Sequence, residues 1–347
     1  MGHLVPWWML EAAAQDPRQE MTVLVISRAQ AEGLIDLHAL IDALATAMAD
    51  LSAGQAYAPD RVAVSVPGHD ARLLAMPGFV PSAGALVTKL VSLFPHNTGA
   101  PPTHQAVVVA FDPGTGQPVA LMDGTAITAM RTGACSALSA RLLARDDADT
   151  VAILGTGEQA RSHAKAMCQV RPIREIRVAG RSYAKAAALA AELGQTLPAA
   201  ARALPTYREA LADAAIACAT THADDPVIRR SWLAPGTHIT SVGFGGREID
   251  DETVRDALVC VESRAAALAP YPAGSIDLLE PIGAGVIPAD HVHTELGELV
   301  SGTKPGRQSP EQITLYKSVG IAVQDAAAAA LILAAACKQS VGQQITL

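Results

Sequence analysis

Residues 155–160 are the segment whose spacing points most directly to chemistry. They read Gly-Thr-Gly-Glu-Gln-Ala, which fits G-x-G-x-x-A, and they stand between an apolar strand pattern and a helical pattern. In that setting the first glycine makes a tight turn, the second lets the backbone approach a pyrophosphate, and the small third residue packs helix on strand. Unpaired N–H groups at the start of the helix then bind the phosphates. A purely structural turn is the alternative. We predict a dinucleotide site formed by Gly155, Thr156, Gly157, Glu158, Gln159 and Ala160.

The end of the next predicted strand indicates which dinucleotide binds. An NAD site normally places Asp or Glu there to hold the ribose 2′-hydroxyl, but this segment reads Val178-Ala179-Gly180-Arg181-Ser182. Arg181 can pair with a 2′-phosphate, and Ser182 can hydrogen-bond to it. A solvated surface arginine is the alternative for Arg181. The sequence therefore predicts NADPH as the cofactor, with NADH possible.

The elements that position these residues change in kind near residue 147. Before it, strand-like runs separated by turn residues predict a meandering, largely antiparallel sheet followed by a helix over 125–143. The runs are 62–66, 73–76, 85–93 and 105–111, with a hairpin turn at 112–116 leading to 118–122. From residue 149 onward, continuous apolar strands alternate with helical patterns, which is typical of a parallel α/β sheet.

The composition excludes several classes of protein. With 347 residues, 50% apolar and 17% charged, the chain has the length of about two domains and too much apolar content for general disorder. A net charge of −8 without a basic stripe argues against nucleic-acid binding.

Five dispersed cysteines indicate free thiols and a cytoplasmic protein, and no metal site is expected. The apolar run at 326–336 is too short to span a membrane. Residues 1–20 read as an extension without signal-peptide features, ahead of a core that begins near Met21.

Four segments together resemble the ornithine cyclodeaminase/μ-crystallin family: 85–94 (ALVTKLVSLF), 104–137 (HQAVVVAFDPGTGQPVALMDGTAITAMRTGACSA), 151–160 (VAILGTGEQA) and 314–325 (TLYKSVGIAVQD). The resemblance covers nearly all of the chain from about residue 22 to residue 335. It implies an α/β fold in which a Rossmann-type parallel sheet domain, residues 147–317, is inserted in a discontinuous α+β domain. That second domain, residues 1–146 plus 318–347, would bind substrate and form a homodimer.

The resemblance also implies a substrate site. Arg61, Lys89 and Arg131 match the positions of the family's carboxylate-binding cluster, although each cation by itself would more often be a surface charge. Two guanidinium groups and an ammonium can hold a carboxylate and orient the neighbouring carbon for hydride transfer. Met76 completes the predicted substrate set, and Lys89 is the predicted catalytic residue, with water as the alternative proton source.

Further cofactor contacts are predicted outside the glycine turn. Thr220 and Thr221 follow a predicted strand at the carboxyl end of the sheet, where a polar strand cap is the alternative interpretation. Ser318 and Gly320 are assigned to the cofactor only because they lie in the family's late motif. The remaining predicted cofactor residues are Thr132, Val242 and Gly243.

Two departures bear on the reaction. Cyclodeaminases that resemble this chain carry a glutamate two residues before the Met-Pro pair and an aspartate soon after the Val-Gly pair of a late strand. Here those places hold Leu74 and, in a shortened loop, Gly245, although Glu248 or Asp250 could substitute for the second acid. The missing carboxylates count against ornithine cyclodeamination.

The remaining groups suit reduction of a cyclic imino acid. We predict an NAD(P)H-dependent ketimine reductase that acts on Δ1-pyrroline-2-carboxylate or Δ1-piperideine-2-carboxylate and gives L-proline or L-pipecolate. An ornithine cyclodeaminase or an alanine-dehydrogenase-like oxidoreductase is the nearest alternative. A non-catalytic, NADPH-dependent ligand-binding protein is the alternative of another class. The residues leave the ring size of the substrate open.

Overall fold

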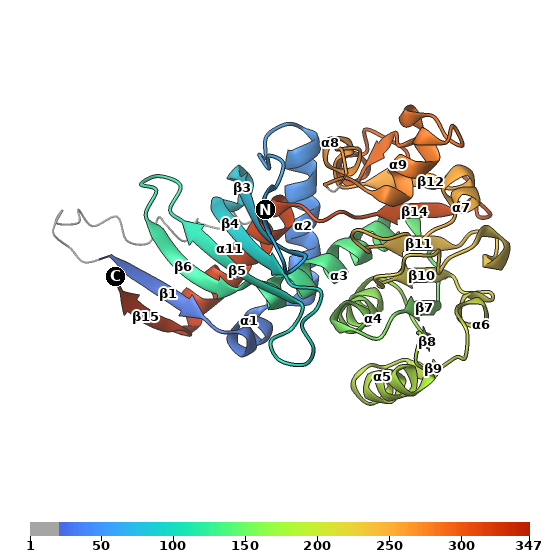
Figure 1. Ribbon diagram of the computed structural model, residues 1–347, viewed down its shortest axis with the longest axis horizontal. Helices are drawn as coiled ribbons and strands as arrows, with labels where there is room; N and C mark the ends of the chain where they lie inside the picture. Colours follow the sequence, from blue (N-terminus) through green and yellow to red (C-terminus); the bar gives the residue numbers. More distant parts are fainter. Residues whose placement is uncertain (1–20, 272) are drawn as a thin grey trace. The chain divides into compact units, whose positions relative to one another are not determined.

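The computed structural model describes residues 21–271 and 273–347 (Figure 1). The extension expected over residues 1–20 lies outside the described residues. The chain divides into two compact units, one that ends at Arg131 and resumes at Ile321, and one that spans Thr132–Gly320. The first division falls inside helix α3 (Gly124–Leu143) rather than near residue 147. The second half of α3 belongs to the second unit because Ser136 and Ser139 hydrogen-bond to His163 and His238 there.

The first unit is built on a seven-stranded sheet with the order β15-β1-β6-β5-β4-β3-β2. The strands from β2 to β6 pair antiparallel with their neighbours, so the predicted meander is confirmed, while β1 pairs parallel with β6. The strands are β1 (Thr22–Ile26), β2 (Val62–Val66), β3 (Ala71–Val80), β4 (Ala85–Leu93), β5 (His104–Phe111), β6 (Pro118–Asp123) and β15 (Gln343–Thr346).

Strand β3 is longer than the predicted run at 73–76, because it continues through Pro77 and Gly78. Pro77 stays in register with Thr88 of β4. Gly78 is needed for packing, since a Cβ at this position would lie 2.8 Å from the side chain of Ala322. Two residues that usually mark the end of a strand therefore serve here to let a helix approach the sheet closely.

Helix α11 (Ala322–Gln339) covers one face of this sheet, packing on β3 and β4 and against helix α2 (Leu37–Ser52), as Figure 1 shows. The unit also contains helix α1 (Arg28–Leu34). Side chains on alternate positions of β3 and β4, including Met76 and Lys89, point to the covered face and are buried. No helix in the described part of the chain is long and apolar enough to cross a membrane.

The second unit is built on an eight-stranded sheet with the order β13-β12-β14-β11-β10-β7-β8-β9. Every neighbouring pair is parallel, as predicted. The strands are β7 (Thr150–Leu154), β8 (Glu175–Ala179), β9 (Ala200–Ala203), β10 (Ile216–Ala219), β11 (His238–Ser241), β12 (Leu258–Val261), β13 (Thr294–Glu295) and β14 (Thr314–Lys317). Strands β9, β13 and β14 were not predicted; they are only two to four residues long.

Helices cover both faces of this sheet, so the strands are apolar on both sides. One core contains Leu154 and Leu315, and the other contains Ile153 and Val178. The helices are α4 (Glu158–Val170), α5 (Tyr183–Thr196), α6 (Tyr207–Leu211), α7 (Asp251–Asp256), α8 (Arg264–Ala267), α9 (Ile276–Gly283) and α10 (Leu296–Ser301). The order of strands reverses between β7 and β10, and in open α/β sheets ligands bind outside the carboxyl ends of strands at such a point.

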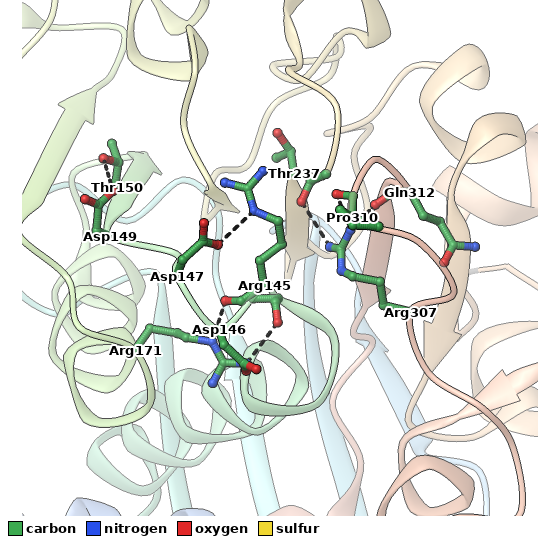
Figure 2. Close-up of polar contacts among 12 residues, drawn as sticks. Arg145, Asp146, Asp147, Asp149, Thr150, Arg171, Thr237, Arg307, Pro310 and Gln312 are labelled. Carbon is green, nitrogen blue, oxygen red and sulfur yellow. Dashed lines mark hydrogen bonds and ion pairs between the residues drawn. The ribbon is translucent and has the colours of Figure 1, made fainter.

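The opposite, amino-terminal edge of the same sheet carries a cluster of arginines (Figure 2). Arg171 donates hydrogen bonds to the carbonyl oxygens of Arg141 at 3.0 Å and Ala144 at 2.9 Å, and Arg307 donates to that of Leu143 at 2.8 Å. The last carbonyls of a helix have no partner within the helix, so these arginines cap the end of α3. This edge of the sheet is therefore occupied by structural contacts.

Candidate functional site

The glycine turn after β7 has the geometry that a dinucleotide requires. Gly155 has φ +122°, and a Cβ there would lie 2.6 Å from the carbonyl oxygen of Thr220, so only glycine fits. Gly157 is the N-cap of α4, and no side chain in the described residues caps that helix. Apart from Gly157 itself and the adjoining backbone, no described atom lies within 4 Å of where a Cβ of Gly157 would be. The turn thus offers open space beside backbone N–H groups, which suits a phosphate.

Packing around the turn also follows the predicted pattern. Ala160 is fully buried in the core that contains Ile153, which brings α4 close to β7. A Cβ at Gly180 would lie 2.9 Å from the Cγ2 atom of Thr156, so the end of β8 packs directly on the turn. The residues present therefore fit a dinucleotide, and Glu158 and Gln159 form the first turn of α4 as expected.

Arg181 and Ser182 follow β8 as the sequence indicates. Arg181 is exposed, and Ser182 is the N-cap of α5, where its hydroxyl accepts a hydrogen bond of 3.4 Å from the backbone N–H of Lys185. A cationic side chain and the start of a 14-residue helix thus lie next to each other. Both features favour an anion such as a 2′-phosphate.

Thr220 and Thr221 lie at the carboxyl end of β10, and both hydroxyls have internal partners. Thr220 donates to the carbonyl oxygen of Leu154 at 2.8 Å, and Thr221 donates to Oε1 of Glu248 at 2.7 Å. The Thr220 hydroxyl therefore caps strand β7, which is the alternative interpretation, and the Thr221 hydroxyl is bound by the Glu248 carboxylate. Their role at the cofactor, through the backbone or otherwise, stays a prediction, as does that of Val242 and Gly243 at the end of β11.

Neither acid that could have replaced the missing aspartate is free to act as a base. Glu248 is fully buried and accepts hydrogen bonds from Thr221, Ser241 and Gly243. Asp250 is the N-cap of α7, and its carboxylate accepts from the backbone N–H groups of Thr253 and Arg230. Both carboxylates are committed to holding the backbone, so they do not substitute for the acid that Gly245 lacks.

A second buried glutamate holds the segment that contains Ser318 and Gly320. Glu262 follows β12 and accepts hydrogen bonds from the Ser318 hydroxyl at 2.5 Å and from the Gly320 N–H at 3.0 Å. Glu262 was not singled out in the sequence, although an acid directly after an apolar strand is a recognisable signal. Thr132 is buried in α3. The cofactor roles of Thr132, Ser318 and Gly320 stay predictions.

In the first unit, Lys89 and Arg131 meet at a residue that sequence reasoning missed. Lys89 on β4 lies 2.8 Å from Oδ2 of Asp325, and the Arg131 Nε atom on α3 lies 3.0 Å from Oδ1 of the same carboxylate. Arg131 also donates to the amide oxygen of Gln324 at 2.6 Å, and Lys89 donates to the Thr128 hydroxyl at 3.3 Å. Lys89 is 2% exposed, Arg131 4% and Asp325 0%, so the group is buried.

The electrostatics of this group depress the pKa of Lys89 from 10.5 to about 8. Burial is the largest cause of the lower pKa, and the charges of Arg131 and Arg61 act in the same direction, while Asp325 opposes them. Burial alone would raise the pKa of Asp325, but Lys89 and Arg131 outweigh burial and hold it below its usual value. Asp325 thus stays ionised, and Lys89 stays mostly protonated near neutral pH with a pKa close to it.

Arg61 and Met76 lie near this group, and their role in substrate binding stays a prediction. Arg61 directly precedes β2, and its charge acts on Lys89. Met76 faces Lys89 across the β3–β4 pair. Leu74 is buried in an apolar cluster with Met76 and Val91, so no carboxylate stands where a cyclodeaminase would carry its glutamate.

Asp325 and Gln324 had a signal in the sequence. They are two adjacent polar residues at the start of an Ala-rich segment, and such residues in a buried helix need partners. The sequence did not reveal the partners of Asp325 and Gln324, because these partners, Lys89 on β4 and Arg131 on α3, lie far away in the sequence. In the described residues, no group of three or more His, Cys, Asp or Glu side chains could hold a metal ion.

Comparison with known proteins gives a consistent result across the chain. Residues 21–340 match the model of the ornithine cyclodeaminase/mu-crystallin family. The chain is 34% identical over 328 residues to a Δ1-pyrroline-2-carboxylate reductase of Bacillus cereus, covering 93% of this chain and 99% of the relative. It is 36% identical over 300 residues to the ketimine reductase mu-crystallin of Mus musculus, covering 84% of this chain and 90% of that protein.

A solved structure is similar over the same range. The Δ1-pyrroline-2-carboxylate reductase of Thermococcus litoralis, in complex with NADH and L-proline, superimposes with a TM-score of 0.89 at 38% sequence identity. The match covers 93% of this chain and 100% of the other. The overall fold of this chain is therefore shared with a protein of this kind.

Proposed function

This chain belongs to the ornithine cyclodeaminase/mu-crystallin family, and we propose that it is an NAD(P)H-dependent reductase of cyclic imino acids. Its substrate is Δ1-pyrroline-2-carboxylate or Δ1-piperideine-2-carboxylate, and its product is L-proline or L-pipecolate. The observation that carries the proposal is the buried group of Lys89, Arg131 and Asp325. The names of the bacterial and mouse relatives, both reductases of this chemistry, support it.

The charge of this group favours an anionic substrate. Lys89 and Arg131 bring two positive charges to the buried group, and Asp325 supplies one negative charge, while the charge of Arg61 also acts on Lys89. Excess charge inside a protein is unfavourable unless it is paired. A substrate carboxylate provides the missing charge, and the guanidinium groups of Arg131 and Arg61 can bind it in a forked geometry.

The surroundings of Lys89 suit a ring rather than a second amino group. Met76 and Leu74 are buried apolar side chains on the same face of β3, and Met76 is the cross-strand neighbour of Lys89. A diamine would need a carboxylate here for its distal ammonium. The methylene groups of a pyrroline or piperideine ring need only an apolar contact, which disfavours ornithine as substrate.

Lys89 is the proton donor in this proposal. With a pKa of about 8 it is mostly charged at pH 7 and still releases a proton readily, which is the range expected of a general acid. A reduced nicotinamide, when bound, supplies the hydride that the C2 carbon of the imine accepts. The proton that Lys89 donates to the ring nitrogen completes the conversion of C=N to CH–NH.

The second unit carries the cofactor in this proposal. The open turn at Gly155 and Gly157 accepts the pyrophosphate, and Arg181 with the start of α5 favours NADPH through its 2′-phosphate. NADH also serves, because NADH and NADPH share the pyrophosphate that binds at the glycine turn. The Asp or Glu that usually stands at the position of Arg181 contacts only the ribose 2′-hydroxyl.

The experiment that tests this function compares substrates by NADPH oxidation. Purified protein should oxidise NADPH with five- or six-membered cyclic imino acids, and the Lys89→Met variant should lose at least about 100-fold in kcat/KM. Lys165, on the surface of α4, supplies the matched control, Lys165→Met. Absence of turnover with either imine, together with ammonia release from ornithine, would refute the proposal. Turnover only with a keto acid plus ammonia or methylamine would favour the alanine-dehydrogenase-like alternative instead.

We also propose that two copies of the chain associate through the face of the seven-stranded sheet that lies opposite helix α11. Val62 and Val64 on β2 and Leu73 on β3 share that face and are 65%, 61% and 47% exposed. Contiguous exposed apolar surface commonly marks an interface.

All five cysteines are free thiols, which supports the expectation of a cytoplasmic protein.

A further inference from the structure

A closed network of charged and polar side chains lies buried in the second unit. Glu248 accepts from the Ser241 hydroxyl at 2.7 Å, and Lys317 donates to the same hydroxyl oxygen at 2.9 Å. Lys317 lies 2.7 Å from Oδ2 of Asp277, and Oδ1 of Asp277 accepts from the backbone N–H of Glu248 at 2.9 Å. The four residues are at most 1% exposed. The network returns to its starting residue, so each member has a partner on two sides.

This network ties together the carboxyl ends of neighbouring strands. Oε1 of Glu248 accepts from the backbone and hydroxyl of Thr221, after β10, and Oε2 accepts from the backbone N–H of Gly243, after β11. Lys317 ends β14 and donates to the carbonyl oxygen of Gly243 at 3.0 Å. Both backbone polar groups of Gly243 therefore have charged partners. Its N–H donates to the Glu248 carboxylate, and its carbonyl oxygen accepts from the Lys317 ammonium.

The same loops adjoin the glycine turn. Thr220, next to Thr221, donates its backbone N–H to Leu154 at 2.9 Å and closes on Gly155 so tightly that a Cβ there would collide. Gly243 is equally confined, because a Cβ on it would lie 2.6 Å from the carboxyl carbon of Glu248. The position of the Glu248 carboxylate therefore sets where the ends of β10 and β11 lie beside the turn.

We propose that Glu248, held by Lys317 and Asp277, is a positioning residue that shapes the surface on which the nicotinamide half of the cofactor binds. The proposal rests on the cofactor binding proposed above. A carboxylate is required because four donors converge on it, two on each oxygen; an amide offers one acceptor oxygen and turns its NH2 group toward two donors. Burial keeps water from competing for these hydrogen bonds. The network can therefore keep the loops after β10 and β11 at fixed positions.

The test measures cofactor binding to the whole protein by NADPH fluorescence, without substrate. Glu248→Gln should raise the Kd for NADPH at least about tenfold, which corresponds to about 1.4 kcal/mol. In kinetics, the KM for the cofactor should rise by a similar factor, with the KM for the imine within about twofold of wild type. Amide hydrogen exchange of Thr221 and Gly243 in the unliganded protein should speed up, since both N–H groups lose their acceptor or its charge.

A matched control separates positioning from general loss of stability. Ser139→Ala removes one of the two side-chain partners of the buried His238, in the same unit but at the amino-terminal start of β11. It should lower the Tm while leaving the Kd for NADPH unchanged. An equal rise in Kd for Ser139→Ala, or an unchanged Kd for Glu248→Gln, would overturn the positioning role.

A milder variant keeps the test decisive if Glu248→Gln does not fold. Ser241→Ala removes one of the four donors, keeps the carboxylate, and should raise the Kd about threefold; an unchanged Kd would then overturn the proposal. Failure of the proposed function looks different, because the wild-type protein would then reduce neither imine, whereas this test uses no substrate. Failure of the proposed cofactor binding would show as a wild-type protein that binds neither NADPH nor NADH.

Discussion

Replacing Asp325 by asparagine should move the alkaline limb of the pH–rate profile, because Asp325 holds the proton on Lys89. The variant keeps the shape of the side chain and removes one charge that lies 2.8 Å from the Lys89 Nζ atom. Burial and the charges of Arg131 and Arg61 then act on Lys89 without an opposing carboxylate. Lys89 should therefore lose its proton at a lower pH than in the wild type.

The size of this shift follows from the distance and the burial. At an effective dielectric constant of about 20, opposite charges about 3 Å apart attract by about 5.5 kcal/mol, which is an upper bound. Neighbouring charges typically shift a pKa by about 1 to 3 units, so the value of about 8 for Lys89 should fall to about 5 to 7. With a pKa of about 6, the protonated fraction at pH 7.5 drops from about three-quarters to about 3%, a loss of about 25-fold.

The assay is kcat/KM for the imine between pH 5 and pH 9, with NADPH saturating. Wild-type activity should fall as the pH rises through about 8, and the Asp325→Asn limb should lie at least about one unit lower, with activity recovered on acidification. The substrate titrates identically in both assays, so the difference between the limbs reports on Lys89.

Thr128→Val provides the control for this measurement. It removes a neutral hydrogen bond to Lys89 of 3.3 Å and leaves the carboxylate in place, so its limb should stay within about 0.5 units of wild type. An Asp325→Asn limb that stays near pH 8, or an activity loss that acid does not restore, would refute the role given to Asp325.

Three further predictions concern the cofactor, stability and assembly. Arg181→Ala should raise the KM for NADPH about 10- to 100-fold and leave that for NADH nearly unchanged, because only NADPH loses a charge-assisted contact; equal effects on both would contradict it. Burial lowers the pKa of His163 to about 4 and that of His238, with help from Arg307 and Arg171, to about 3. As the pH falls below about 6.5, these histidines bind protons in the unfolded chain before they do so in the folded protein. The free energy of unfolding should therefore be largest above that pH and should drop by about 2 kcal/mol for each histidine by about pH 5. Urea unfolding at pH 7 and pH 5 measures this, and a stability unchanged over that range contradicts it. Val64→Lys should convert a dimer to a monomer in sedimentation at unchanged secondary structure, because it puts a charge on the exposed apolar face; an unchanged mass would show that this face is not the interface.

Local sequence signals were sufficient where the chemistry is local. The turn from Gly155 to Ala160 was predicted in its place between strand and helix, since each glycine has a requirement that nearby residues impose. The meander and the parallel sheet were also predicted, because hydrophobic periodicity and turn residues operate over a few positions. Strand β14 was not predicted, because its place between β11 and β12 in the sheet is set by tertiary pairing rather than by its own four residues.

The sequence by itself determined the kinds of element, the glycine turn and the cations available to an anionic ligand. Only the tertiary structure decided which carboxylate each cation meets. Lys89 and Asp325 are separated by 236 residues, and their pairing exists because α11 packs on β4. The same holds for Glu248, whose place in the sequence left it open as a base, whereas packing surrounds it with donors from Thr221, Ser241 and Gly243. The pKa and the accessibility of a charged group depend on neighbours brought together by folding, and its position along the chain does not reveal them.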